Sequence, residues 1–374
     1  MHNILYFGFK EKMKICFFIG GLNSSGGTER VSSVIASELQ QRGYQIHMLN
    51  LQCGDKPFFE LADGIQVNQL FTSVGRGMLR LPLVIVKLRR YLKQHKIDIL
   101  IDVESMLALY ALPAVIGLNV RHICWEHFNY NVDLGKASRR LARKLAARFA
   151  DDVVTLTERD KQLWLANTTC KARITTISNP VTISLPSEIN LQKEKLFLAV
   201  GRLTYQKGFD LLLQAWAQVA PLYPDWRLRI VGDGEDKAML EQLCCELNIE
   251  ASTELVPKTK NIAVYYQEAA YFVMSSRFEG FGLVLVEAQA YGLPIISFDC
   301  DVGPSDIIIN DSTGWLCRQN DVFSMAHKIR NAISIYNEDN DRYYSMCSES
   351  IVNSRRFSID VILNEWIDLI ERIS

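Results

Sequence analysis

The chain has 374 residues, of which 48% are hydrophobic and 22% charged, and its formal net charge is −1. This length predicts two domains, and the composition is that of a globular protein rather than a disordered one. The charge is unevenly spread, because residues 1–182 hold 24 Lys+Arg against 15 Asp+Glu and the remainder is acidic. The basic half is therefore expected to meet an anionic partner, such as phospholipid headgroups, a pyrophosphate or nucleic acid.

The start of the chain and its cysteines indicate a cytoplasmic protein. Residues 1–12 do not resemble a signal peptide, because charged residues interrupt them at 10–12. We expect translation to begin either at Met1 or at Met13, where the first strand opens. Nine cysteines without a C-x-x-C pair suit a reducing compartment. The longest apolar stretch, 106–118, is too short to span a bilayer.

The first half alternates predicted strands and helices. The strands are expected at 14–19, 44–51, 65–70, 97–103, 121–125, 153–157 and 174–177, and the helices at 31–41, 79–96, 106–118, 136–150 and from 158 onward. The loop after the first strand is rich in glycine and contains Gly26 and Gly27. A strand, glycines and a helix indicate a phosphate-binding loop, although neither the P-loop spacing nor G-x-G-x-x-G fits. The alternative is an ordinary strand-to-helix connection.

Two helices of this half are basic and amphipathic. They are 79–96 and 136–150, and the second carries Arg139, Arg140, Arg143, Lys144 and Arg148. Such helices could lie on an anionic membrane surface, or could simply present a solvated basic face.

The polar segment 184–195 is expected to link two domains. After it the alternation resumes, with strands at 197–200, 227–231, 253–256, 271–274 and 294–297, and a final amphipathic helix at 360–373. Repeated strand–helix units predict mostly parallel, doubly wound sheets. The chain is therefore expected to form two Rossmann-like halves that face each other across a cleft.

The most informative stretch follows the strand at 271–274. Gly280 and Gly282 flank Phe281 in a tight turn, and a helix is predicted from Leu283. Backbone N–H groups of such a turn and the positive end of a helix bind phosphate. Two carboxylates, Glu279 and Glu287, are about two helical turns apart and suit two sets of sugar hydroxyls. The alternative is a helix-end Glu and a solvated Glu.

Other polar residues lie at the predicted carboxyl ends of strands, where ligands of open α/β sheets bind. Arg202 and Lys207 share one loop and could neutralise a departing diphosphate. His127 ends a strand on the cleft side, where it could either serve the site or be a structural histidine. The motif Asp299-Cys300-Asp301 resembles a metal-binding D-x-D, but we expect no metal, because cationic groups already serve the phosphates. Catalytic-triad ordering, zinc spacing and nucleic-acid motifs are all missing from the sequence.

Four motifs in order, G-G-T-E-R, G-R-L-x-x-x-K-G, V-G-D-G and E-G-F-G-L-V-L-V-E, resemble those of the retaining family-4 glycosyltransferases of GT-B fold. The resemblance covers nearly all of 13–373 and is greatest to bacterial members that build O-antigen, capsule, exopolysaccharide or lipid-linked oligosaccharide. It implies domains at 13–182 and 183–357, with the helix 358–374 packing back onto the first. It implies no cofactor.

The resemblance also implies roles for the residues above. Glu287 would bind the nucleotide ribose, and Glu279 with the amides of Gly280, Phe281, Gly282 and Leu283 would hold the donor sugar. Arg202 and Lys207 would hold the diphosphate, Gly26 and Gly27 would lie near the donor phosphate and acceptor, and His127 would approach the donor sugar. Val256 is in the base-binding region, where Pro257 replaces the glycine of many relatives and leaves the choice of nucleotide open.

The expected reaction is transfer of a hexose or N-acetylhexosamine from a nucleotide sugar, for which a UDP-sugar is expected, to a polyprenyl-diphosphate-linked saccharide. It would take place at the cytoplasmic face of the inner membrane, without a metal and with retention at the anomeric carbon. A nucleotide-sugar epimerase and an inactive nucleotide-sugar-binding partner are the alternatives. The basic half argues against the first, and the intact set of Glu279, Glu287, Arg202 and Lys207 argues against the second.

Overall fold

The computed structural model describes residues 13–75, 80–185 and 189–372. Our predictions for the segment 1–12 and for the first translated residue concern residues outside the described ranges. Part of the predicted linker and one end of each of two predicted helices also lie outside these ranges.

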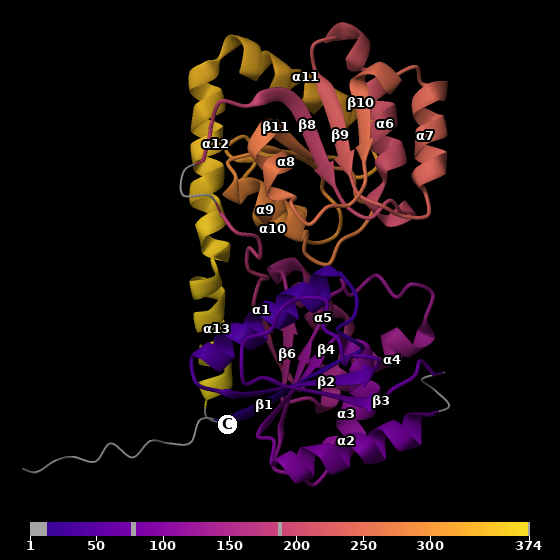
Figure 1. The fold of residues 1–374 in the computed structure, drawn as a ribbon, viewed down its shortest axis with the longest axis vertical. Helices are drawn as coiled ribbons and strands as arrows, with labels where there is room; N and C mark the ends of the chain where they lie inside the picture. Colours follow the sequence, from indigo (N-terminus) through magenta and orange to yellow (C-terminus); the bar gives the residue numbers. More distant parts are fainter. Residues whose placement is uncertain (1–12, 76–79, 186–188, 373–374) are drawn as a thin grey trace, which may run out of the picture.

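The described residues form two α/β domains, each built on a parallel sheet (Figure 1). The first sheet has the order β3-β2-β1-β4-β5-β6-β7 and the second the order β10-β9-β8-β11-β12-β13. The strands of the first sheet are β1 (Lys14–Ile19), β2 (Gln45–Gln52), β3 (Gln66–Phe71), β4 (Ile99–Val103), β5 (Arg121–Trp125), β6 (Asp152–Thr155) and β7 (Arg173–Thr176). Those of the second are β8 (Glu194–Val200), β9 (Arg227–Val231), β10 (Thr253–Val256), β11 (Ala269–Met274), β12 (Ile295–Phe298) and β13 (Gly314–Cys317). The expected architecture of two doubly wound parallel sheets is confirmed.

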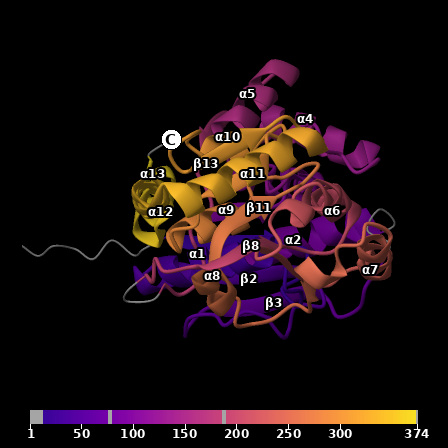
Figure 2. The same cartoon turned by 90° about the horizontal axis from the view of Figure 1, so that it is seen from above.

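Helices cover both faces of each sheet (Figure 2). Those of the first half are α1 (Gly27–Gln41), α2 (Leu81–His95), α3 (Ala108–Val115), α4 (Ala137–Phe149) and α5 (Glu158–Asn167). Those of the second half are α6 (Phe209–Ala217), α7 (Lys237–Glu246), α8 (Ala263–Glu268), α9 (Leu283–Ala290), α10 (Pro304–Ile307), α11 (Val322–Glu338), α12 (Asn340–Ser354) and α13 (Ile359–Glu371). Because helices cover both faces, the central strands β4 and β11 are buried along their whole length.

The last two helices run in line along one side of the molecule, α12 beside the second domain and α13 beside the first (Figure 1). The ring of Trp366 in α13 lies 4.7 Å from that of Trp125 in β5. Arg121 donates a hydrogen bond of 2.8 Å to the carbonyl of Leu369. The end of the chain therefore completes the core of the domain with which the chain begins.

The chain crosses between the domains twice, and the two crossings touch. The N–H of Val181 in the first crossing donates a hydrogen bond of 2.8 Å to the carbonyl of Phe357 in the second. Among the described helices, none has the length and apolar character needed to cross a membrane.

Candidate active site

The turn between β11 and α9 lies against the first domain. Gly282 has φ 95° and ends the turn at the start of α9, a conformation that only glycine adopts without strain. A Cβ at Gly280 would lie 2.1 Å from the carbonyl oxygen of His127. The sequence therefore needs both glycines, one to make the turn and the other to let the two domains meet.

Glu279 and Lys207 are brought together at this turn. The Lys207 Nζ lies 2.6 Å from Glu279 Oε1, and the Ser276 hydroxyl donates to the same oxygen at 2.6 Å. The side chains of Lys207 and Glu279 are only 18% and 7% exposed. An ion pair so far removed from water is held in a defined geometry, and it leaves Glu279 Oε2 and two Lys207 protons to contact a ligand.

The helices α1 and α9 both begin beside the turn that carries Glu279. A Cβ on Gly27, the first residue of α1, would lie 3.0 Å from Leu283 Cδ1, in the first turn of α9. The N-termini of α1 and α9 therefore converge from different domains. Unpaired N–H groups and two helix dipoles create a positive potential there, as an anion site requires.

Glu287 lies about one helical turn after Leu283 in α9, and its side chain is 2% exposed. Its carboxylate forms an ion pair with Arg30 of α1 and accepts a hydrogen bond of 3.0 Å from the Tyr266 hydroxyl. The Thr182 hydroxyl is 3.4 Å from the same carboxylate. Glu287 is thus an interdomain anchor in this structure, and its contact with a ribose stays a prediction.

His127 is enclosed beside Trp125, with their ring centroids 4.4 Å apart. Burial lowers the pKa of His127 to about 3, so that the ring is neutral at physiological pH. Among the described residues, its buried Nε2 has no hydrogen-bond partner. The ring therefore keeps one hydrogen-bonding nitrogen unused beside the turn that carries Glu279.

The segment that carries His127 is fixed by a buried carboxylate. Glu126 Oε1 accepts the N–H groups of His127 and Phe128, at 3.0 and 3.1 Å. Its Oε2 accepts hydrogen bonds from Ser105 Oγ at 2.7 Å and from Arg143 Nε at 2.8 Å. The loop after β5 thus has a defined conformation before any ligand binds.

These contacts correct the expectation for helix 136–150. Arg143 is 1% and Arg139 5% exposed, and they pair with Glu126 and Glu104 inside the first domain. Two of the five basic residues expected on a solvent or membrane face are therefore structural. Arg140, Lys144 and Arg148 do face solvent.

The remaining predicted residues are less tightly grouped. Arg202 lies on the loop after β8, but its side chain is exposed. Phe281 is 3% exposed and packs on Phe357 at a centroid distance of 5.6 Å, so only its backbone can contact a ligand. The Val256 carbonyl accepts a hydrogen bond of 2.8 Å from Gly232 and ties β10 to the V-G-D-G loop.

Both aspartates of the D-x-D sequence contact the first domain. Asp299 pairs with Arg159 of α5 at 2.9 Å, and Asp301 accepts a hydrogen bond of 3.1 Å from Asn131. Within the described part of the chain, no three His, Cys, Asp or Glu side chains are grouped as metal ligands would be.

Arg30 and Asn129 were not predicted to belong to the site. Arg30 ends the G-G-T-E-R motif directly before the predicted helix 31–41, and this place beside the predicted phosphate loop was a usable signal. Asn129 donates a hydrogen bond of 3.0 Å to the Glu279 carbonyl across the domain boundary, and nothing in the sequence indicated that contact.

Known families match both halves of the chain. Residues 25–185 match the model of Glycosyltransferase Family 4, and residues 184–346 match that of Glycosyl transferases group 1. An uncharacterized glycosyltransferase of Haemophilus influenzae is 35% identical over 94% of this chain and 98% of its own length. The amylovoran biosynthesis glycosyltransferase of Erwinia amylovora is 30% identical over 96% of this chain and 99% of its own.

The name of a more distant relative includes its acceptor. This relative is an α-1,4-N-acetyl-D-galactosaminyltransferase of Campylobacter jejuni that acts on an undecaprenyl-diphosphate-linked saccharide; it is 26% identical over 96% of this chain and 99% of its own. Among solved structures, the apo lipopolysaccharide outer core galactosyltransferase superposes with a TM-score of 0.78 at 24% identity, covering 96% of this chain and 99% of its own. That likeness bears on the fold alone.

Proposed function

Because the chain belongs to the family-4 glycosyltransferases of GT-B fold, we propose that it moves a hexose or N-acetylhexosamine from a UDP-sugar to a polyprenyl-diphosphate-linked saccharide. The pathway would be the synthesis of O-antigen, capsule or exopolysaccharide. The named relatives support this choice, since one belongs to amylovoran biosynthesis and another acts on a lipid-diphosphate-linked saccharide.

The observation that carries the proposal is the pair of Lys207 and Glu279 beside the meeting N-termini of α1 and α9. This arrangement offers an ammonium group and backbone amides to a diphosphate, and a carboxylate to sugar hydroxyls. The amides of Gly280 to Leu283 would hold the donor, with Gly26 and Gly27 facing them. Arg202 would turn in from solvent when the diphosphate binds.

The proposed mechanism follows from charge. The bond between the anomeric carbon and the diphosphate breaks through an oxocarbenium-like state, and the leaving diphosphate gains negative charge. Lys207 and the helix N-termini are preorganised to stabilise that charge, which is the main catalytic task, and Arg202 would join them after it turns in from solvent. The cationic groups make a metal ion unnecessary in this proposal, and Asp299 and Asp301 serve the domain contact instead.

We further propose that the configuration at the anomeric carbon is retained. The acceptor hydroxyl would attack from the face of the leaving group, and a phosphate oxygen would accept its proton. Glu279 is engaged by Lys207 and Ser276, so it would orient the sugar rather than act as a nucleophile. The neutral His127 would exchange a hydrogen bond with a donor-sugar hydroxyl through Nε2.

Glu287 would bind the ribose only after its contact with Arg30 is rearranged. We propose that the nucleotide takes the place of the guanidinium, and that Val256 lies near the base. The proposed domain limits are 13–182 and 183–357, with 358–374 part of the first domain in space, as the contacts of α13 support.

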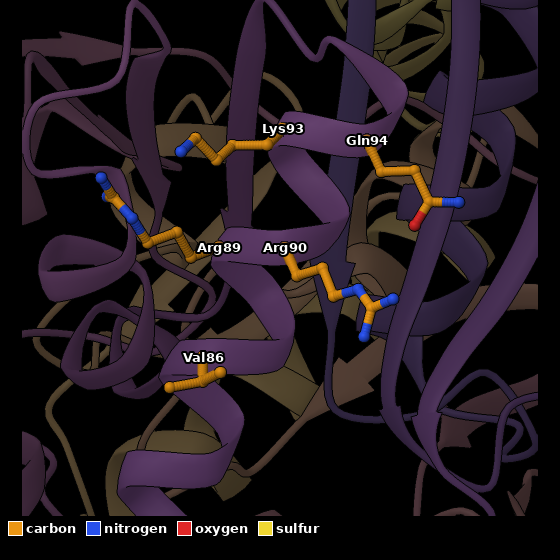
Figure 3. Close-up of a pocket in the computed structure, with 5 residues that line it drawn as sticks. All are labelled: Val86, Arg89, Arg90, Lys93 and Gln94. Atoms are coloured by element: carbon orange, nitrogen blue, oxygen red, sulfur yellow. The ribbon is translucent and has the colours of Figure 1, made fainter.

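We propose that the basic first domain lies on the anionic cytoplasmic face of the inner membrane. The outer side of α2 supports this, because its basic residues line a pocket together with Val86 and Gln94 (Figure 3). Leu83 and Val86 are 50% and 63% exposed on the same helix. Exposed apolar side chains among Arg and Lys are typical of helices that bind the bilayer interface.

The test is a mass-spectrometric transfer assay. The purified protein is given a panel of UDP- and GDP-sugars and polyprenyl-diphosphate-linked saccharides, with EDTA throughout. A product heavier by one sugar identifies the donor and supports the metal-free reaction. Activity only after Mg²⁺ is added contradicts the metal-free mechanism. Isomerised donor without product would instead indicate an epimerase, and donor binding without any reaction an inactive partner protein.

A further inference from the structure

A strained residue lies at the carboxyl end of β4, in the centre of the first sheet. Glu104 has φ 108° and ψ 132°, a conformation that costs a residue with a side chain about 1–3 kcal/mol. The strand order reverses beside it, because β1 pairs with β2 on one side and with β4 on the other. Ligands of open parallel sheets bind at such a reversal, outside the carboxyl ends of the strands.

Glu104 is connected to the candidate active site through two side chains. Its Oε1 lies 2.7 Å from Arg139 Nη1, and the Arg139 guanidinium lies over the Phe128 ring at 4.3 Å. The backbone of Phe128 in turn abuts Gly280, since a Cβ on that glycine would lie 3.2 Å from the Phe128 Cα. The pair is therefore on the first-domain side of the turn that carries Glu279.

The hydrogen-bonding capacity of this pair is incompletely used. The side chain of Arg139 is 5% exposed, and its Nη1 faces the Glu104 carboxylate, yet its Nε has no hydrogen-bond acceptor among the described residues. The side chain of Glu104 remains 29% exposed. Burial nevertheless raises the pKa of Glu104, and the nearby Arg139 opposes that rise. A buried donor without a partner beside an accessible carboxylate calls for a ligand with several oxygen atoms.

We propose that Glu104 accepts hydrogen bonds from hydroxyls of the acceptor saccharide. Arg139 is the positioning residue that orients the Glu104 carboxylate. This inference rests on the proposed transferase function. The strained backbone is the cost of directing the carboxylate toward the acceptor.

The test compares Glu104→Gln with Glu38→Gln, a change to a half-buried carboxylate of α1 in the same domain. The full-length variants receive a saturating UDP-sugar and a titrated polyprenyl-diphosphate-linked saccharide, in the combination that gives product with the unaltered protein. Loss of a charged hydrogen bond is expected to raise the acceptor KM of Glu104→Gln about ten- to hundred-fold. The donor KM and the release of UDP without acceptor should not change, and Glu38→Gln should match the unaltered protein.

A second variant separates function from folding. Glu104→Gly relieves the backbone strain but leaves the buried Arg139 without its carboxylate, so it should melt no lower than Glu104→Ala, which loses the same carboxylate and keeps the strain, while its acceptor KM should rise as in Glu104→Gln. Arg139→Lys should raise the acceptor KM too, whereas Arg140→Lys, at the exposed neighbour, should not.

The outcomes that overturn the inference differ from those that overturn the function. An unchanged acceptor KM in Glu104→Gln and Glu104→Gly overturns the inference alone. A parallel loss of donor affinity and UDP release indicates general damage to the site and also overturns it. If the unaltered protein transfers no sugar, the proposed function fails and the inference fails with it.

Discussion

The ion pair between Arg30 and Glu287 gives a measurable prediction about how the domains are held together. Arg30→Met leaves a carboxylate that is 2% exposed with only Tyr266 and Thr182 as partners. Removing one member of a fully buried pair costs about 3–5 kcal/mol. Because the Arg30 side chain is 24% exposed, water can reach part of the gap, and about 2–3 kcal/mol is expected here.

This cost falls on the contact between the domains rather than on either core, because Arg30 and Glu287 belong to different domains. The equilibrium between touching and separated domains should therefore shift by about 30- to 160-fold in Arg30→Met. Small-angle X-ray scattering of the nucleotide-free protein should show a larger radius of gyration. Arg42→Met is the matched control, since this arginine at the other end of α1 pairs with Asp360 at an exposed position.

A double variant tests the reasoning further. Adding Glu287→Gln to Arg30→Met removes the uncompensated charge, so the double variant should have a smaller radius of gyration than Arg30→Met alone. The reasoning is refuted if Arg30→Met scatters like the unaltered protein, or if the effects of the two substitutions simply add.

Three further predictions concern catalysis, pH and membrane contact. Lys207→Ala and Glu279→Ala should each lower the transfer rate by at least about 100-fold with an unchanged circular dichroism spectrum; normal turnover in either would remove the site assignment. The pKa of His127 is lowered to about 3, so the unfolded chain binds a proton there below about pH 6.5 while the folded protein does not. The stability that this histidine contributes is complete above that pH and falls by about 1.4 kcal/mol per unit below it. Urea unfolding at pH 7 and 5 should show a larger loss of stability in the unaltered protein than in His127→Gln, which keeps the buried His47, and equal losses would show that burial of His127 is not the cause. Charge reversal at Arg90 and Lys93 of α2, or at Arg140, Lys144 and Arg148 of α4, should weaken binding to anionic vesicles at low salt. Binding that is unaffected would exclude these faces as the membrane contact.

The sequence was sufficient for every described strand except β13. The predicted bounds of β1, β5, β9 and β10 coincide with those in the structure, because buried parallel strands are apolar runs with sharp polar ends. The sequence also predicted that Lys207 and Glu279 belong to one site, since each comes after the carboxyl end of a strand, but it did not predict the ion pair between them. The edge strand β13 and the helices α8, α11 and α12 were missed. β13 has only four residues, which is too short for a periodic pattern.

The orientation of charged side chains could not be derived in the same way. Helical periodicity placed Arg139 and Arg143 on a polar face of α4, whereas both point inward to carboxylates. A buried ion pair depends on a partner distant in the chain, such as Glu126, and its position is visible only after folding. The same reason kept Arg30 and Asn129 from being recognised as bridges between the domains.

The position of α13 has a consequence for synthesis on the ribosome. Strands β1 to β7 emerge first, but the apolar surface around Trp125 is covered only when residues 359–371 have been made. The second domain, whose strands end at Cys317, can pack before that helix leaves the exit tunnel. The order of completion is thus the reverse of the usual one, in which the N-terminal domain folds first. A ribosome that stops before residue 359 releases a chain whose first domain still exposes the binding face of α13.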